Sequence, residues 1–197
     1  DLGFTCVIYD HRNHGYSGKA PTTMGYYEAR DLKKVCDYVR DRFAEDIIIG
    51  THGESMGGAT VMMNAALDRG LAFVIEDCGY SDLSSQLSHN MKSIYHLPRF
   101  PFLGIASVFS KLRGGVYFSQ VIPKNVLAEC EATPMLFLHG DQDDFVPTYM
   151  VGENHNAKKG YRRMRIFPNS GHAESYMKNK KEYGQEIEDF LKEIAVL

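Results

Sequence analysis

The most constraining feature of this chain is a short apolar run that leads directly into a glycine-containing turn and a helix-like stretch. The apolar, β-branched residues Ile47–Thr51 predict a buried strand, and the small and apolar residues Met56–Leu67 predict a helix. Between them, Gly53, Ser55 and Gly57 match the pattern G-x-S-x-G. A turn this sharp is expected to leave room only for hydrogen at both glycines. It would expose Ser55 at a helix N-terminus, where backbone N–H groups favour developing negative charge.

The composition is that of an ordinary globular protein and argues against several function classes. The chain has 197 residues, of which 44% are hydrophobic and 24% charged, enough for one domain with a substantial core. A net charge of −3 gives no electrostatic case for binding nucleic acid or an anionic membrane. No apolar run approaches the ~20 residues of a membrane span. Free thiols, rather than disulfides or metal ligands, are expected from the four widely spaced cysteines, which are Cys6, Cys36, Cys78 and Cys130.

Strand-like and helix-like segments alternate along the rest of the chain. Short apolar, β-rich runs predict further strands at Phe4–Tyr9, Ala72–Glu76, Pro134–His139 and Arg163–Phe167. Helical spacing of apolar residues and a favourable first-turn proline predict helices at Tyr26–Phe43, Pro147–Ala157 and Lys181–Ile194. This alternation implies an α/β fold with a mostly parallel sheet that helices cover on both faces.

Residues 81 to about 132 interrupt this alternation within what we expect to be a single domain of residues 1–197. They combine helix-like pieces with Pro98, Pro101 and many apolar and aromatic side chains. One interpretation is a helical, cap-like insertion over the carboxyl edge of the sheet. The other is a set of extra helices packed on the core. Both interpretations stay open, since each can hold for a different part of the segment.

Three residue types that together make an activated nucleophile are expected at the carboxyl ends of three strands. They are Ser55, an aspartate in the loop after His139, and His172. Loops at this edge are where open α/β sheets place their sites. A serine hydroxyl becomes a good nucleophile when an imidazole takes its proton, and a carboxylate fixes the tautomer of that imidazole. This set predicts nucleophilic catalysis that needs no metal ion and no organic cofactor.

Four motifs spread along the chain carry a resemblance to a known family. They are YDHRNHGYSG at 9–18, GESMGG at 53–58, HGDQDDFVP at 139–147 and SGHAES at 170–175. With these motifs the chain resembles the α/β-hydrolase superfamily, in particular serine hydrolases of the prolyl-oligopeptidase-like and esterase kind. More narrowly, it is similar to the uncharacterised α/β-hydrolases of Firmicutes. The resemblance implies the α/β-hydrolase fold and a triad in the order Ser, Asp, His, but it specifies no substrate.

The resemblance also implies roles for particular residues. The pattern H-G-x-x-D-x-x-V-P makes Asp143 the triad acid, in preference to Asp141 and Asp144, which are expected to cap the next helix or to be solvated. The backbone N–H of Met56, the residue after the nucleophile, is the implied first oxyanion donor. Glu54 is expected to pack or pair beneath the nucleophile. The other loop and strand-end histidines are expected to satisfy backbone groups, and these are His11, His14, His52 and His139.

One part of the family's fold is expected to be missing from this chain. In the family, the strand before the one that corresponds to Phe4–Tyr9 leads into the loop with the second oxyanion donor. That strand would lie between Phe4–Tyr9 and Ile47–Thr51. The chain is therefore expected to be the carboxyl-terminal part of a longer protein. Its expected localisation is cytoplasmic, although a preceding segment would be able to carry a membrane anchor or a signal.

The expected function is that of a serine hydrolase that cleaves carboxylic esters through an acyl-enzyme, with a small-molecule ester or acyl compound as its substrate. A serine peptidase or thioesterase of the same fold would use the same triad and stays open as an alternative. A truncated, non-catalytic binding module is the alternative from a different class. The serine at the turn argues against a dehalogenase, whose nucleophile at this position is a carboxylate. The oligomeric state is left open.

Overall fold

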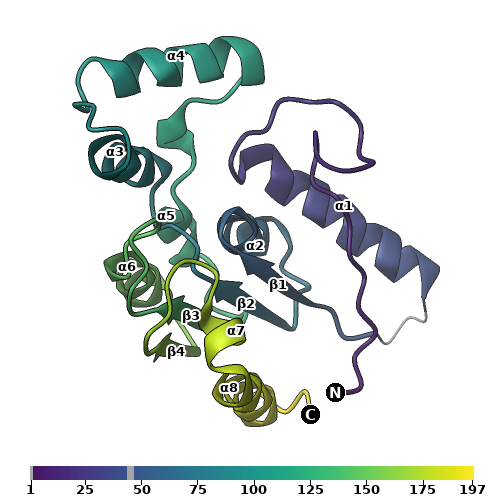
Figure 1. Ribbon diagram of the computed structural model, residues 1–197. Helices are drawn as coiled ribbons and strands as arrows, with labels where there is room; N and C mark the ends of the chain where they lie inside the picture. The colour runs from purple at the N-terminus through teal and green to yellow at the C-terminus, as the bar shows by residue number, and fades with distance from the viewer. Residues whose placement is uncertain (1, 44–46) are drawn as a thin grey trace.

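The computed structural model describes residues 2–43 and 47–197, which form a central sheet with helices on both faces (Figure 1). In the described residues the sheet contains four parallel strands, in the order β1 (Gly50–Glu54), β2 (Phe73–Asp77), β3 (Met135–Gly140) and β4 (Arg162–Phe167). The helices are α1 (Tyr26–Arg42), α2 (Met56–Leu67), α3 (Leu83–Ser93), α4 (Phe102–Gly114), η1 (Phe118–Gln120), α5 (Pro123–Leu127), α6 (Tyr149–Ala157), α7 (Ser175–Lys178) and α8 (Lys180–Glu193). The expected α/β fold with a parallel sheet is confirmed.

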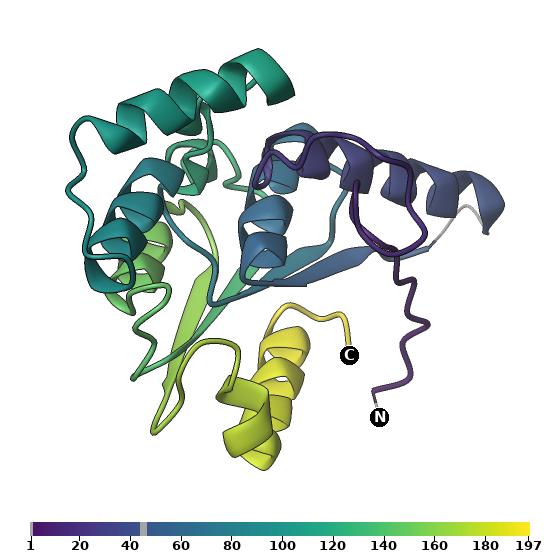
Figure 2. The same cartoon turned by 45° about the horizontal axis from the view of Figure 1, so that its top comes forward.

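The two faces of the sheet bury different side chains. Because successive residues of a strand point to opposite faces, Val74 and Phe137 pack towards α2, α5 and α6, on the face that α1 also covers. Ile75 and Leu138 point the other way and pack against α8, where Phe190 is fully buried. Figure 2 shows α8 on one side of the sheet and α1 and α2 on the other. Burial on both faces explains the unbroken apolar runs Phe73–Ile75 in β2 and Met135–Leu138 in β3.

Two expected strands differ from the structure. Residues 4–9 form no strand and their side chains are exposed, with Ile8 93% exposed. An apolar run becomes a strand only where a neighbour satisfies its backbone hydrogen bonds, and no described strand lies beside this one. The strand predicted at Ile47–Thr51 begins three residues later, at Gly50. In the described part of the chain β1 pairs with β2 alone, so it is an edge strand and not the buried strand expected.

Local side-chain bonds explain where two of the helices begin. At the start of α1, the Glu28 carboxylate accepts hydrogen bonds from Gly25 N–H at 2.9 Å and from Thr23 N–H at 2.7 Å. At the start of α3, Asp82 accepts from Ser85 N–H at 2.8 Å. Asp82 satisfies an amide that α3 leaves without a partner in its first turn, and Glu28 binds the amides of two residues just before α1. Both carboxylates also complement the dipole of their helix.

The segment 81–132 folds into α3, α4, η1 and α5. Leu127 of α5 is fully buried in the core, in agreement with the interpretation of extra packed helices. In contrast, α4 lies away from the sheet, and Leu103 is its one buried residue (Figures 1 and 2). Whether this part acts as a cap over a site stays a prediction. In the described ranges, no helix combines the length and the hydropathy that crossing a bilayer requires.

Candidate active site

Ser55 occupies the sharp turn between β1 and α2. Its backbone has φ 55° and ψ −115°, which is unusual for a residue with a side chain and costs roughly 1–3 kcal/mol. The turn is held by hydrogen bonds from Ser55 N–H to Asp77 C=O at 2.8 Å and from Ala59 N–H to Ser55 C=O at 3.1 Å. The first bond ties the turn to β2 and the second ties it to α2. The serine is thereby fixed at the carboxyl end of β1.

The glycines around this turn are not equally constrained. A Cβ at Gly53 would lie 2.2 Å from the backbone oxygen of Gly57, so only glycine fits there. At Gly57 a Cβ would meet open space, and the expectation that this position also requires glycine is wrong. The tight packing occurs one residue later, where a Cβ at Gly58 would lie 3.0 Å from the Cα of Gly79. This approach brings α2 against the end of β2, a contact that G-x-S-x-G does not specify.

The structure brings Ser55, His172 and Asp143 together, although they are far apart in sequence. His172 lies in the loop after β4, and its Nε2 is 2.8 Å from Ser55 Oγ. Its Nδ1 is 2.8 Å from Asp143 Oδ2, in the loop after β3. The ring of Phe145 lies beside the imidazole, with 4.9 Å between the ring centroids. Both ring nitrogens of His172 therefore have a partner, in the order that proton transfer from a hydroxyl requires.

Asp143 is held as a carboxylate by several donors. Its Oδ1 accepts from Phe145 N–H at 3.0 Å and from Val146 N–H at 2.8 Å. Its Oδ2 lies 3.2 Å from Nε2 of the buried His139 and also contacts His172. Burial raises the pKa of this carboxyl, but hydrogen bonds from His139, His172 and Val146 outweigh the burial and lower the pKa to about 2.

The neighbouring acids are placed differently from Asp143. Asp141 accepts a hydrogen bond from Ser170 N–H at 3.2 Å, which closes the loop after β4 onto the loop after β3. The backbone carbonyl of Asp144 lies 2.9 Å from Nε2 of His89, on α3. Both side chains are exposed, and neither bonds to His172 in the described residues. The geometry thus favours Asp143 as the partner of His172.

His139 and Cys78 lie next to the Ser55, His172 and Asp143 set, and the sequence did not assign them to it. His139 does satisfy a backbone group, as expected, since its Nε2 lies 2.9 Å from Val146 C=O, but it also contacts Asp143. Cys78 follows β2, is fully buried and has φ 46°. Its sulfur lies within 4.8 Å of ligand-type atoms of Asp143 and His172. The contact of His139 could have been predicted from its position four residues before Asp143. No local sequence feature predicts that Cys78 lies near the site.

The donor types of Cys78, Asp143 and His172 would suit a metal ion, but their bonding does not. A coordinating imidazole needs a free ring nitrogen, and both nitrogens of His172 already have partners. A coordinating cysteine is a thiolate, and burial raises the pKa of the Cys78 thiol well above its ordinary value. The bonding of these three residues therefore does not suit a metal ion.

A cavity of about 390 Å³ lies over Ser55. Met56 lines it at the first position of α2, where a backbone N–H has no partner within the helix, as the expected oxyanion donor requires. The rest of the lining comes from the segment before α1 and from α1, β1 and α2. These residues are Val7, Ile8, Tyr9, His11, Leu32, His52, Gly53, Glu54, Gly57, Thr60 and Val61. An acyl group would have apolar and aromatic neighbours here.

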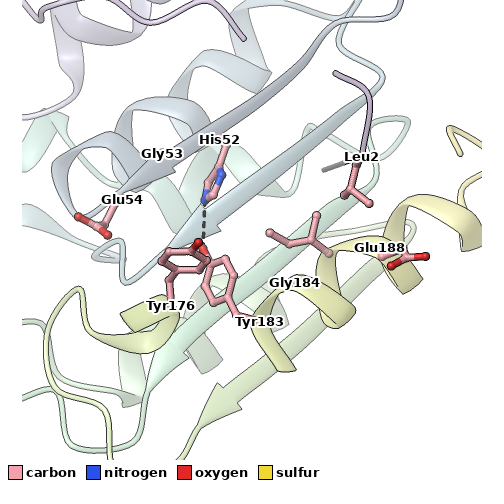
Figure 3. A pocket seen from close by; sticks show the side chains of 9 residues that line it. Leu2, His52, Gly53, Glu54, Tyr176, Tyr183, Gly184 and Glu188 are labelled. Carbon is pink, nitrogen blue, oxygen red and sulfur yellow. Dashed lines mark hydrogen bonds between the residues drawn. The ribbon is translucent and has the colours of Figure 1, made fainter. Parts of the chain in front are cut away.

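A larger hollow of about 630 Å³ lies between β1 and α8, and Ser55 does not line it (Figure 3). Here the Tyr183 hydroxyl donates to Asp77 Oδ2 at 2.8 Å and lies 3.2 Å from Nε2 of His52. His52 thus has a side-chain partner rather than the backbone partner expected. Glu54 lines both hollows with an exposed side chain, so it does not pack beneath the nucleophile. Burial raises the pKa of Glu54, and the negative charge of Asp77 raises it further.

The parallel sheet, the strained serine at the turn between β1 and α2, and the loops that converge on it define an α/β-hydrolase. Solved structures support this fold. An esterase of Pyrococcus furiosus, Pf2001, aligns with a TM-score of 0.72 and 22% identity over 93% of this chain and 68% of its own. The Penicillium α/β-hydrolase GrgF aligns with a TM-score of 0.74 and 18% identity over 98% of this chain and 80% of its own.

Sequence comparison is more specific than the fold. The prolyl oligopeptidase family matches residues 1–196, and the chain belongs to this family. It is also 38% identical over 193 residues to an uncharacterised Bacillus subtilis protein, YqkD. That match covers 97% of this chain and 63% of YqkD, so the chain spans less than two thirds of this relative's length.

Proposed function

We propose that this protein is a serine hydrolase that cleaves small carboxylic esters through an acyl-enzyme, with Ser55, His172 and Asp143 as its catalytic triad. The observation that carries the proposal is the chain of two 2.8 Å contacts, from Ser55 Oγ to His172 Nε2 and from His172 Nδ1 to Asp143 Oδ2. The membership of a family of serine hydrolases and the esterase among the structural neighbours support it.

In the proposed first half-reaction, Ser55 Oγ attacks the acyl carbon while His172 Nε2 takes the hydroxyl proton. The carbonyl oxygen becomes an oxyanion, which the Met56 N–H and the adjacent helix N-terminus stabilise. Asp143 stabilises the imidazolium without taking its proton. When the intermediate collapses, the ester C–O bond breaks and His172 gives the proton to the leaving alcohol.

In the second half-reaction, water replaces the alcohol beside the acyl-enzyme. His172 Nε2 removes a proton from this water, whose oxygen bonds to the acyl carbon. The bond from the acyl carbon to Ser55 Oγ then breaks, and His172 returns the proton to the serine. The products are a carboxylic acid and the free enzyme, so no redox partner is needed.

Peptidase and thioesterase activities remain alternatives because they need the same triad and differ in the leaving group. An ester is the leading proposal because apolar side chains, among them Val7, Ile8 and Leu32, form much of the cavity over Ser55. A panel of p-nitrophenyl esters, peptide p-nitroanilides and acyl thioesters tests which of these three substrate classes the protein cleaves fastest. Faster turnover of a peptide or a thioester would replace the leading proposal.

The first test is intact-mass analysis after exposure of the whole protein to a fluorophosphonate probe, with peptide mapping. Such probes react with a serine that its histidine has activated. We expect a single adduct on Ser55 and none in Ser55→Ala. Ser81→Ala, which changes a buried serine bonded to Glu153, serves as the matched control and should label fully. A folded protein that forms no adduct would support the non-catalytic alternative.

A further inference from the structure

The outward face of α4 is apolar, which is the reverse of the usual arrangement for a helix at a protein surface. The side chains of Phe102, Ile105, Val108, Phe109 and Leu112 are 45%, 50%, 49%, 60% and 76% exposed. Their spacing of three or four residues places them on one side of the helix. We call this set the α4 apolar face. Contiguous apolar surface of this kind marks an interaction site more often than chance exposure does.

The inward face of α4 carries one leucine and two serines that fix the helix to the protein. Leu103 is buried, and Ser107 Oγ accepts a hydrogen bond from Phe118 N–H at 3.1 Å. One helical turn further on, Ser110 Oγ donates to Val116 C=O at 2.8 Å. These bonds set the rotation of α4 about its axis. The apolar side is therefore held outward, at a place remote from the sheet in Figure 1.

The segment that contains this face carries charges of one sign. Residues 83–128 contain five of the chain's 22 lysine and arginine residues and none of its 25 acidic residues. Lys124 pairs with Glu153, whereas no carboxylate of the described residues pairs with Arg99 or Arg113. Both arginines are exposed, one just before α4 and one in its last turn. The chain's net charge of −3 conceals this local basic region.

We propose that the α4 apolar face docks on a lipid–water interface that carries anionic headgroups. An interfacial helix buries its apolar side chains at the level of the acyl chains while flanking cations reach the headgroups. Tyr95 and Phe100, in the connection between α3 and α4, are also exposed, at 66% and 85%. Aromatic side chains are typical of protein surfaces that lie at the membrane–water interface.

A second copy of the chain fits this surface less well. In a two-fold dimer through α4, each residue would lie near its own counterpart or that of a neighbour. Arg99 and Arg113 of one copy would then approach those of the other, and residues 83–128 contain no carboxylate to compensate them. An anionic lipid surface supplies both the apolar phase and the negative charge.

The test is flotation of the whole protein, in the Ser55→Ala form, with vesicles of phosphatidylcholine containing or lacking phosphatidylglycerol. We expect clear binding only when phosphatidylglycerol is present. The double variant Phe109→Ser/Arg113→Gln should lower the vesicle-bound to free ratio at least ~10-fold. Ile105→Ser/Leu112→Ser, a second variant of the same face, should have a similar effect with the arginines intact.

The matched control changes a pair with the same spacing on α1, Lys34→Gln/Tyr38→Ser, where both side chains are exposed. It should bind vesicles like the parent, and circular dichroism should show all variants folded. Equal vesicle binding by the α4 variants and the parent would overturn the proposal. It would also be overturned if the parent did not bind vesicles that contain phosphatidylglycerol. A lipid-free dimer that Phe109→Ser/Arg113→Gln converts to a monomer would overturn it in favour of a second copy.

Discussion

At the scale of single residues, Asp143 is the carboxylate on which both histidines of the site converge. Its role predicts that Asp143→Asn lowers kcat by about 10⁴ with little change in KM, because the imidazole loses the group that fixes its tautomer and stabilises its charge. Steady-state hydrolysis of a p-nitrophenyl ester measures both constants. The matched controls are Asp141→Asn and Asp144→Asn, which should stay within a few-fold of the parent. A comparable loss in either control would reassign the acid.

The sequence predicted which three side chains meet but not all that surrounds them. Ser55, His172 and an aspartate after His139 could be chosen because each follows a predicted strand, and parallel strands end at the same edge of a sheet. The family resemblance then singled out Asp143. Cys78 also follows a predicted strand, but its proximity to His172 depends on the path of the loop after β4, which the local sequence does not specify. The second contact of His139 depends likewise on the path of the loop after β3.

At the scale of elements, the turn between β1 and α2 gives a prediction that separates two glycines of one motif. Gly53→Ala should destabilise the fold by about 1–3 kcal/mol or more, because its Cβ would overlap the backbone oxygen of Gly57. Gly57→Ala should be neutral or stabilising by up to about 1 kcal/mol, because its Cβ meets open space. Urea unfolding measures both free energies. Equal losses in the two variants would show that the turn is packed differently.

The predicted helices and the strands β2, β3 and β4 agree with the structure to within two residues, whereas the strands predicted at 4–9 and 47–51 do not. The predicted helix at 56–67 coincides with α2, and the closing helix at 181–194 differs from α8 by one residue at each end. Helical hydrogen bonds are internal, so the local pattern is sufficient. Strand bonds are external, and the run at 4–9 has the composition of a strand without a described neighbour to pair with.

At the scale of the whole molecule, the low pKa of Asp143 predicts how stability depends on pH. The folded state holds this carboxyl with a pKa of about 2, below its ordinary value of 3.8, so in that range it binds fewer protons than the unfolded state. The resulting stabilisation, about 2 kcal/mol, is present above pH ~4 and is lost as pH falls from ~4 to ~2.

Urea unfolding at several pH values between about 2 and 5 tests this dependence. Between about pH 5 and pH 2, the loss in free energy of unfolding should be about 2 kcal/mol smaller in Asp143→Asn than in the parent. Asp141→Asn, which changes an exposed carboxylate of the same loop, should keep the parent's slope. Identical slopes in the parent and in Asp143→Asn would contradict the assignment.

The order of the site residues along the chain has a practical consequence. Ser55 precedes the projecting helix α4, whereas Asp143 and His172 follow it. A cut within α4 would divide the chain into two polypeptides, neither of which holds the three residues together. Among the described strands, the two polypeptides would be joined in the sheet by the pairing of β2 with β3 alone. If mixing the two polypeptides restores ester hydrolysis, β2 and β3 have paired again. Ester hydrolysis would then measure the reassembly of the two parts of the molecule.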